Sequence, residues 1–300
     1  MTWTAPFLDH LAEPAAWAYR SGQAPATEPA ALAALALIGH ARPDVARAPL
    51  DWLASLQAGD GRIGIDALQK EPNWPTLWAI LAWTAHAHAS SVPLAKSAYI
   101  DQIELALRWM LTQKGRPIER SRELGHDSTL VGWPWVASTH SWLEPTCLAV
   151  LALRATGRRT DARCEEAIRL LTDRLLPKGG ANYGNTLVLG QELLAHFQPT
   201  GLVLLALAGL KLQDERLPKT VAWLEQNITA DLPGASLAYA LMGLATADKT
   251  PPAADDWLRD RAEQSERPNR FLPVRSLALL AALGPRNPLV TLPRALEYDA

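Results

Sequence analysis

Cysteine is among the scarcest residues in this 300-residue sequence, which contains only Cys147 and Cys164. The two form no CxxC pair, and Cys147 lies within an apolar segment. The sequence therefore favours reduced thiols in the core over a disulfide framework or a zinc site, and we expect no metal. Reduced thiols suit a cytoplasmic protein, which is the location we expect.

Charge imbalance, a leader and long hydrophobic runs are missing as well. Lys and Arg number 29 against 31 Asp and Glu, a formal net charge of −2, so neither nucleic acid nor an anionic membrane surface is an expected partner. Residues 1–9 contain no basic stretch followed by an unbroken apolar run, so we expect no secretory signal. The longest apolar runs, 30–39 and 202–212, are shorter than the ~20 residues that span a bilayer, so no transmembrane segment is expected.

Signatures of nucleotide chemistry and of serine hydrolases are also lacking. The sequence contains no phosphate-binding loop, no dinucleotide fingerprint and no Gly-x-Ser-x-Gly elbow. It therefore predicts no cofactor.

What the sequence does contain is a short phrase that recurs before segments rich in alanine and leucine. It combines a polar or aromatic residue with proline and usually threonine, at Glu28-Pro29, Trp74-Pro75-Thr76, Glu144-Pro145-Thr146 and Gln198-Pro199-Thr200. Proline fits the first turn of a helix, where its missing N–H has no partner to lose. A start signal used four times predicts repeated helical hairpins.

The same phrase gives its acids and amides a structural explanation. Glu28, Glu144 and Gln198 precede a helix-starting proline, where unpaired amides and the positive end of the helix dipole favour acceptors. On this interpretation, the three residues need no catalytic role.

The repeats sort into two layers. Six segments, starting near residues 29, 75, 145, 199, 235 and 273, are apolar almost all round, whereas the segments between them mix charged and apolar residues. Helices that are apolar on every side are buried, so we predict an all-α (α/α)6 toroid with an inner apolar ring and an outer amphipathic ring. We expect one domain over 1–300: an N-terminal outer helix in 1–20, repeats over 28–284, and an irregular strap over 285–300.

Two stretches match a repeat known from one family. Residues 52–62, Trp-Leu-Ala-Ser-Leu-Gln-Ala-Gly-Asp-Gly-Arg, and residues 179–185, Gly-Gly-Ala-Asn-Tyr-Gly-Asn, resemble the prenyltransferase and squalene oxidase repeat of the terpenoid cyclase and protein prenyltransferase superfamily. The resemblance implies a toroid that binds a hydrophobic or isoprenoid-like ligand. The family's Asp-x-Asp-Asp acid motif and its zinc-binding Asp-x-Cys pair are absent, so catalysis is not implied residue by residue.

Two long connections hold the candidate site residues. Residues 113–143 and 177–197 both precede inner helices, so they are expected at the same end of the ring. Aromatic faces there can stack on a sugar or stabilise a cation, and a nearby acid or histidine can transfer a proton. The candidate catalytic residues are His140, Glu144 and Asp127. The candidate ligand-binding residues are Trp133, Trp135, Trp142, Trp74, Trp78, Asn182, Tyr183, His196 and Gln198.

Three functional hypotheses follow. The first is a toroid that binds a hydrophobic small molecule at its mouth, with catalysis unproven. The second is a noncatalytic scaffold whose rim binds a protein partner. The third is a carbohydrate-active toroid, which requires two carboxylates ~5 to 10 Å apart across the mouth.

Overall fold

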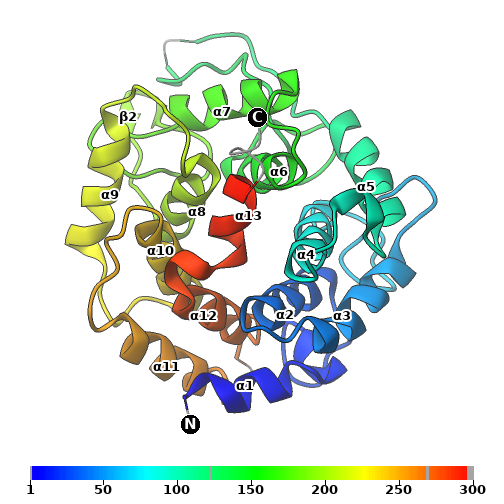
Figure 1. Cartoon of the computed structure of the whole chain (residues 1–300). Coiled ribbons are helices and arrows are strands. Elements are labelled where there is room, and N and C mark those ends of the chain that lie inside the picture. The colour runs from blue at the N-terminus through cyan, green and yellow to red at the C-terminus, as the bar shows by residue number, and fades with distance from the viewer. Residues whose placement is uncertain (1, 122, 268–269, 296–300) are drawn as a thin grey trace.

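The computed structural model describes residues 2–121, 123–267 and 270–295, which form two concentric rings of helices (Figure 1). The inner ring consists of α2 (Thr27–Gly39), α4 (Thr76–Ala89), α6 (Leu143–Ala155), α8 (Phe197–Leu207), α10 (Gly234–Ala245) and α12 (Val274–Ala282). The outer ring consists of α1 (Thr4–His10), α3 (Pro43–Leu56), α5 (Ile100–Thr112), α7 (Ala162–Asp173), α9 (Arg216–Asn227) and α11 (Ala254–Gln264). The predicted (α/α)6 toroid is confirmed.

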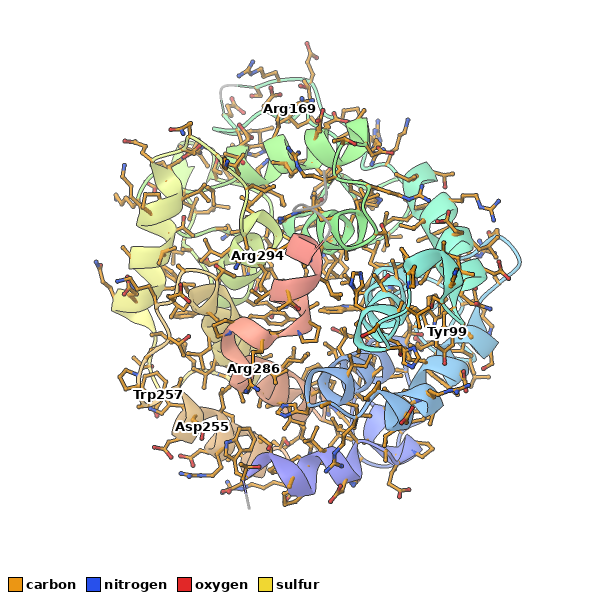
Figure 2. The ribbon with its side chains drawn as sticks, viewed as in Figure 1. Tyr99, Arg169, Asp255, Trp257, Arg286 and Arg294 are labelled. Carbon is orange, nitrogen blue, oxygen red and sulfur yellow. The ribbon has the colours of Figure 1, made fainter. Side chains whose placement is uncertain are left out.

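The ring closes where its first and last elements meet. Helix α12 packs against α2, so the last inner helix completes the inner ring. In the outer ring the indole of Trp3 donates to Asp255 Oδ1 of α11 at 2.9 Å, and Asp9 pairs with Arg42 beside α3. Figure 2 shows Asp255 on the outer ring beside the start of α1. The N-terminal helix therefore takes the sixth outer position.

Threonine explains why the proline phrase recurs. The hydroxyl of Thr146 accepts from the backbone N–H of Trp133 at 3.0 Å and donates to the carbonyl of Trp142 at 2.6 Å. Thr200 does the same with Ala181 and His196, at 2.9 and 2.6 Å. Each of these threonines ties the preceding loop to the first turn of an inner helix, which fixes the loops at one end of the ring, here called the mouth.

The C-terminal segment differs from the expected irregular strap. Residues Gly284–Arg286 form a short 3-10 helix (η3), and Pro288–Ala295 form helix α13, which crosses the ring (Figure 1). The side chain of Asn287 accepts from the N–H of Leu289 at 2.9 Å, and Pro288 occupies the first helical position. The expected irregular strap is therefore wrong over 288–295, because Pro288 starts a capped helix. Residues 296–300 lie outside the described part of the chain.

Short elements complete the connections. They are the 3-10 helices η1 (Pro14–Trp17) and η2 (Leu94–Lys96) and a hairpin of two-residue strands, β1 (Leu187–Val188) and β2 (Gln191–Glu192), in the second long loop. Within the described ranges, every helix is too short or too polar to cross a membrane.

Candidate functional site

Two carboxyl groups enter the mouth from equivalent positions of the inner ring. Glu28 is the second residue of α2 and Glu144 is the second residue of α6, and each is followed by proline. Gln198 occupies the same position in α8. The repeated phrase therefore delivers two acids and one amide to the same level of the ring.

The surroundings of Glu144 favour its protonated form. Its side chain is 6% exposed, and burial, followed by the negative charge of Glu28, raises the pKa of Glu144 to about 8. The amide of Gln198 opposes this rise by donating to both carboxyl oxygens, at 3.1 and 3.2 Å. Glu144 therefore carries a proton over much of the neutral range.

The pKa of Glu28 is raised less than that of Glu144. Burial raises the pKa of Glu28 to about 7, and a hydrogen bond from the hydroxyl of Tyr19 to Oε2, at 2.8 Å, works against that rise. Part of the Glu28 side chain remains accessible. Both pKa values are raised toward neutrality, and the charge of Glu28 is one cause of the rise at Glu144, so the two acids are electrostatically coupled.

The charges of both acids affect the pKa of a tyrosine of the inner ring. Tyr239 of α10 is 2% exposed, and its pKa is raised by burial, then by the charges of Glu144 and Glu28. Helix α10 lies close to α8 because Gly201 packs against the carbonyl of Tyr239, where a side chain would not fit. Three inner helices thus direct ionisable groups into one shared space.

The helix-start explanation covers the prolines and threonines but not the two acids. Among the described residues, neither carboxyl accepts a hydrogen bond from a backbone N–H of its own helix; their partners are the side chains of Tyr19 and Gln198. Both groups are also buried enough to raise their pKa, which removes the benefit that an ionised acid gains from a helix dipole. Their position therefore costs stability and requires a different reason.

Aromatic pairs surround this space in the loops at the mouth. Trp74 meets Trp135 edge to face, with ring centroids 4.7 Å apart, and Trp142 lies 4.4 Å from the ring of His140. Further round the rim are the pairs Tyr183 with His196, at 5.1 Å, and Tyr19 with Phe271, at 5.9 Å. The charge of Glu144 contributes to a raised pKa of Tyr183, so this part of the rim lies near that acid.

Two of the expected ligand-binding tryptophans are buried. Trp133 is 2% exposed, donates its indole N–H to the carbonyl of Met110 at 2.8 Å, and is covered by the guanidinium of Arg163 at 4.3 Å. Trp78 is fully buried in α4. Both therefore serve the wall of the toroid, because a large apolar ring in a helical repeat is most stable when packed.

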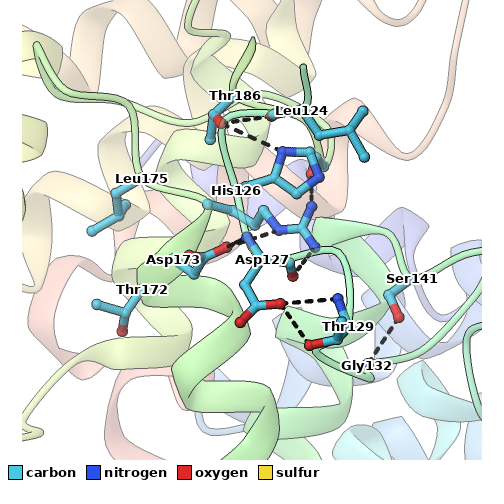
Figure 3. Close-up of polar contacts among 12 residues, drawn as sticks. Leu124, His126, Asp127, Thr129, Gly132, Ser141, Thr172, Asp173, Leu175 and Thr186 are labelled. Atoms are coloured by element: carbon cyan, nitrogen blue, oxygen red, sulfur yellow. Dashed lines mark hydrogen bonds and ion pairs between the residues drawn. The ribbon is translucent and has the colours of Figure 1, made fainter. Parts of the chain in front are cut away.

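The first long loop places Asp127 differently from the expected catalytic position. Its carboxylate accepts from the N–H and the hydroxyl of Thr129 at 3.0 and 2.6 Å, as Figure 3 shows. These hydrogen bonds lower the pKa of Asp127, and its nearest cation is Arg120 at 3.9 Å. A solvated, ionised carboxylate that closes a turn is not suited to donate a proton.

The remaining expected residues divide between binding and loop structure. His140 is held neutral because burial and then Arg174 lower its pKa, and its ring lies tilted against that of Trp142. Asn182 bridges its own loop by donating to the carbonyl of Leu194 at 2.6 Å. His196 lies against Tyr183, so the two candidate histidines belong to different aromatic pairs. In the described ranges no three metal-binding side chains converge.

Sequence reasoning missed Glu28, Tyr19 and Tyr239 as site residues. The signal for Glu28 was available, because it shares its phrase with Glu144; the repetition was interpreted as structural. Tyr19 and Tyr239 carry no local motif; Tyr19 reaches Glu28 from the segment that precedes α2, and packing of the inner ring brings Tyr239 near both acids.

Comparison with models of known protein families and with curated proteins found no match. Solved structures do match. An endo-β-1,4-glucanase of Acetobacter xylinum aligns with a TM-score of 0.56 at 15% identity, over 99% of this chain and 98% of that one. A reducing-end-xylose releasing exo-oligoxylanase complexed with xylobiose aligns at 0.56 and 13% identity, over 92% and 84%. A protein from Actinoplanes aligns at 0.55 and 15% identity, over 94% and 96%.

These matches show that the chain has a fold found in glycosidases, and they make the resemblance to terpenoid cyclases and protein prenyltransferases wrong. The first stretch that carried it ends helix α3 and continues into the connection to α4, and the second lies in the connection from α7 to α8. Gly61 and Gly179, both at positive φ, bring these turns against the backbone of Leu105 in α5 and Lys219 in α9. A ring of helical hairpins needs such close turns. The glycines are therefore explained by this architecture and do not indicate a terpenoid family.

Proposed function

We propose that this protein hydrolyses glycosidic bonds, with Glu144 as the general acid and Glu28 as the general base. The observation that carries the proposal is the pair of buried, electrostatically coupled carboxyl groups at the mouth. Burial and the charge of Glu28 keep a proton on Glu144, while the hydroxyl of Tyr19 favours the ionised form of Glu28. Such a division of protonation is what acid–base cleavage of a glycoside requires.

The proposed reaction uses one water molecule. Protonated Glu144 donates its proton to the glycosidic oxygen as the bond from that oxygen to the anomeric carbon breaks. Ionised Glu28 takes a proton from the water whose oxygen bonds to the anomeric carbon. Exchange of protons with solvent then restores both groups, so the reaction needs no metal or cofactor.

The rim offers aromatic surfaces of the kind that bind sugars. Tyr183 and Phe271 are 40% and 41% exposed, and Trp74, Trp135 and Trp142 are partly exposed. Apolar faces of pyranose rings stack on aromatic side chains, whereas the buried carboxyls contact the polar edges. The glycosidase fold and the bound xylobiose of one matching structure add support of a weaker kind.

The test is hydrolysis of β-1,4-linked xylo- and cello-oligosaccharides, with and without acidic side groups, by the purified protein. Glu144→Gln and Glu28→Gln should each lower kcat/KM about 100- to 10,000-fold, because each removes one proton-transfer group while preserving shape. Asp127→Asn is the matched control, since that carboxylate closes a turn, and it should retain activity.

One outcome favours the rival function. If the wild-type protein cleaves none of these glycans, or if both glutamine variants stay fully active, the acid–base assignment fails. A toroid without hydrolysis would leave the noncatalytic scaffold as the better hypothesis.

A further inference from the structure

A cavity of about 120 Å³ lies inside the first long loop and is here called the Arg116 pocket. Its lining residues are Arg116, Ile118, Leu124, His126, Ser128, Leu130, His140, Ser141, Arg174 and Asn185. This volume accommodates a carboxylate or sulfate group together with part of a sugar ring. The pocket therefore matches a substituent better than a whole oligosaccharide.

The charged side chains in the lining of this pocket are positive. Among the described residues, it is lined by two arginines and by no aspartate or glutamate. Arg174 is 4% exposed; its guanidinium donates to the carbonyls of Gly184 and Asp127 at 2.6 and 3.2 Å, and Asp173 lies 3.5 Å from Nε. The guanidinium of Arg116 is exposed, and no described residue forms a hydrogen bond or ion pair with it. Arg116 thus leaves one uncompensated positive charge at the pocket.

Neutral polar groups complete the lining; the hydroxyl of Ser128 donates to the carbonyl of Glu119, and that of Ser141 accepts from the N–H of Gly132. His126 is 9% exposed, and burial lowers its pKa to about 4, so the ring is uncharged at neutral pH. His140 is also neutral, and Asn185 and two serines add polar groups. An anion that enters this half-enclosed site exchanges water for an arginine and neutral polar groups. These partners offset part of the free-energy cost of removing the anion from water, so the site is suited to an anion.

Neighbouring cavities show that this property is local. The cavity on the other side of His126 contains Asp127 and Asp173 in its lining, so it disfavours an anion. A larger cavity carries Arg159, Lys211 and Arg294 but lies at the opposite end of the ring, away from the two acids. The Arg116 pocket combines positive charge with a position at the mouth.

The pocket also lies on the Glu144 side of the mouth. His140 belongs to its lining and lies against Trp142, two residues before Glu144. On the other side, Asn185 follows Tyr183, which lies within the electrostatic reach of Glu144. A substituent held in the pocket therefore belongs to a sugar unit bound close to the acid.

We propose that the Arg116 pocket binds the anionic substituent, a carboxylate or a sulfate ester, of an acidic glycan, and that acidic oligosaccharides are the substrate class of this site. The assignment rests on the proposed function for its catalytic meaning. The pocket itself is defined by Arg116, Arg174 and the neutral groups between them, independently of any reaction.

Direct binding of small sugars tests the pocket without hydrolysis. Glucose, glucuronic acid and glucose 6-sulfate would be titrated separately to millimolar concentrations and followed by NMR. At least one of the two anionic sugars should bind about tenfold or more tightly than glucose, and added salt should weaken that binding. Preference for glucuronic acid identifies a uronate substituent, and preference for the sulfate ester identifies a sulfated glycan.

Two arginines of the same loop provide the matched variants. Arg116→Gln should remove the preference for the anionic sugar, a loss of roughly 10- to 100-fold in affinity. Arg120→Gln, four residues along, is the control, because Arg120 lines the neighbouring cavity and pairs with Asp127. Circular dichroism would confirm that both variants fold.

The result that overturns the inference is equal binding of all three sugars, no binding of either anionic sugar, or equal losses in the two variants. Its failure is distinct from failure of the proposed function. Cleavage of neutral glycans without any acidic preference contradicts only the pocket, whereas binding of an anionic sugar without cleavage of any glycan contradicts only the catalytic assignment.

Discussion

The two ends of the toroid are built from the same helices and differ in chemistry. At the mouth, long loops surround two buried acids, and their neighbours are hydroxyls, amides and aromatic rings. At the opposite end, α13 lies across the ends of the inner helices; Arg294 of α13 donates to the carbonyl of Thr246 at 3.3 Å, and Figure 2 shows Arg286 and Arg294 near the two ends of the segment that crosses the ring. The buried acids at the mouth reduce the stability of the fold, whereas the side chains of α13 at the opposite end increase it.

Under the proposed function, this difference separates groups that serve activity from groups that serve stability. Buried carboxyl groups are costly when ionised, and the proposed acid–base role gives a reason for their presence at the mouth. Leu289 and Val290 of α13 are buried against the inner ring and need no such reason. Stability and activity are expected to respond separately to changes at the two ends.

The largest expected effect on stability lies at the closed end. Leu289 is fully buried, so Leu289→Ala should reduce the free energy of unfolding by about 2 to 5 kcal/mol through lost burial and a cavity. Chemical denaturation measures this change, and the activity of the folded fraction should stay near the wild-type value. If the kcat/KM of the folded variant falls strongly, the expected separation between stability at the closed end and activity at the mouth is contradicted.

The second effect is a gain in stability at the mouth. The folded pKa of Glu144 is raised to about 8, above its unfolded value, so the folded state binds this proton more tightly. Its stabilising contribution is complete below the unfolded pKa and is lost as pH rises to about 8. Each pKa unit corresponds to about 1.4 kcal/mol, so the rise from 4.5 to about 8 should make Glu144→Gln more stable than wild type at pH above 8 by on the order of 5 kcal/mol.

Thermal melts at acidic and alkaline pH measure this gain. Near pH 4 the variant and the wild type should unfold at similar temperatures, because Glu144 is protonated in both states there. An equal difference at both pH values would show that the carboxyl group does not titrate as described.

The smallest effect concerns the rate profile. Activity should rise as Glu28 ionises near pH 7 and fall as Glu144 ionises near pH 8, with the two apparent values belonging to the coupled pair. Tyr19→Phe removes the hydrogen bond that favours ionised Glu28, so the acidic limb should move to higher pH by less than about one unit. The alkaline limb should move little. A profile in which Tyr19→Phe moves only the alkaline limb would reverse the two roles.

Much of the fold was predictable from local patterns. The six inner helices begin within two residues of the expected starts, because proline in the first turn and continuous apolar faces act within one helix. Helix α13 was missed, since its cap at Asn287 and its proline at the first position look like breakers without a partner surface. The site was less predictable: Glu144, Gln198 and Tyr183 were named, but Trp133 proved buried and Asp127 closes a turn.

The sequence by itself determined the helices, their layers and the end of the ring that carries the long loops, because these follow from hydrophobic periodicity and short-range capping. Only the tertiary structure decided that Glu28 and Glu144 act on one another. The two residues are far apart in the chain, and their pKa values depend on burial and on Tyr19 and Gln198 from other segments. Electrostatic coupling depends on distance in space, which the packing of the inner helices sets.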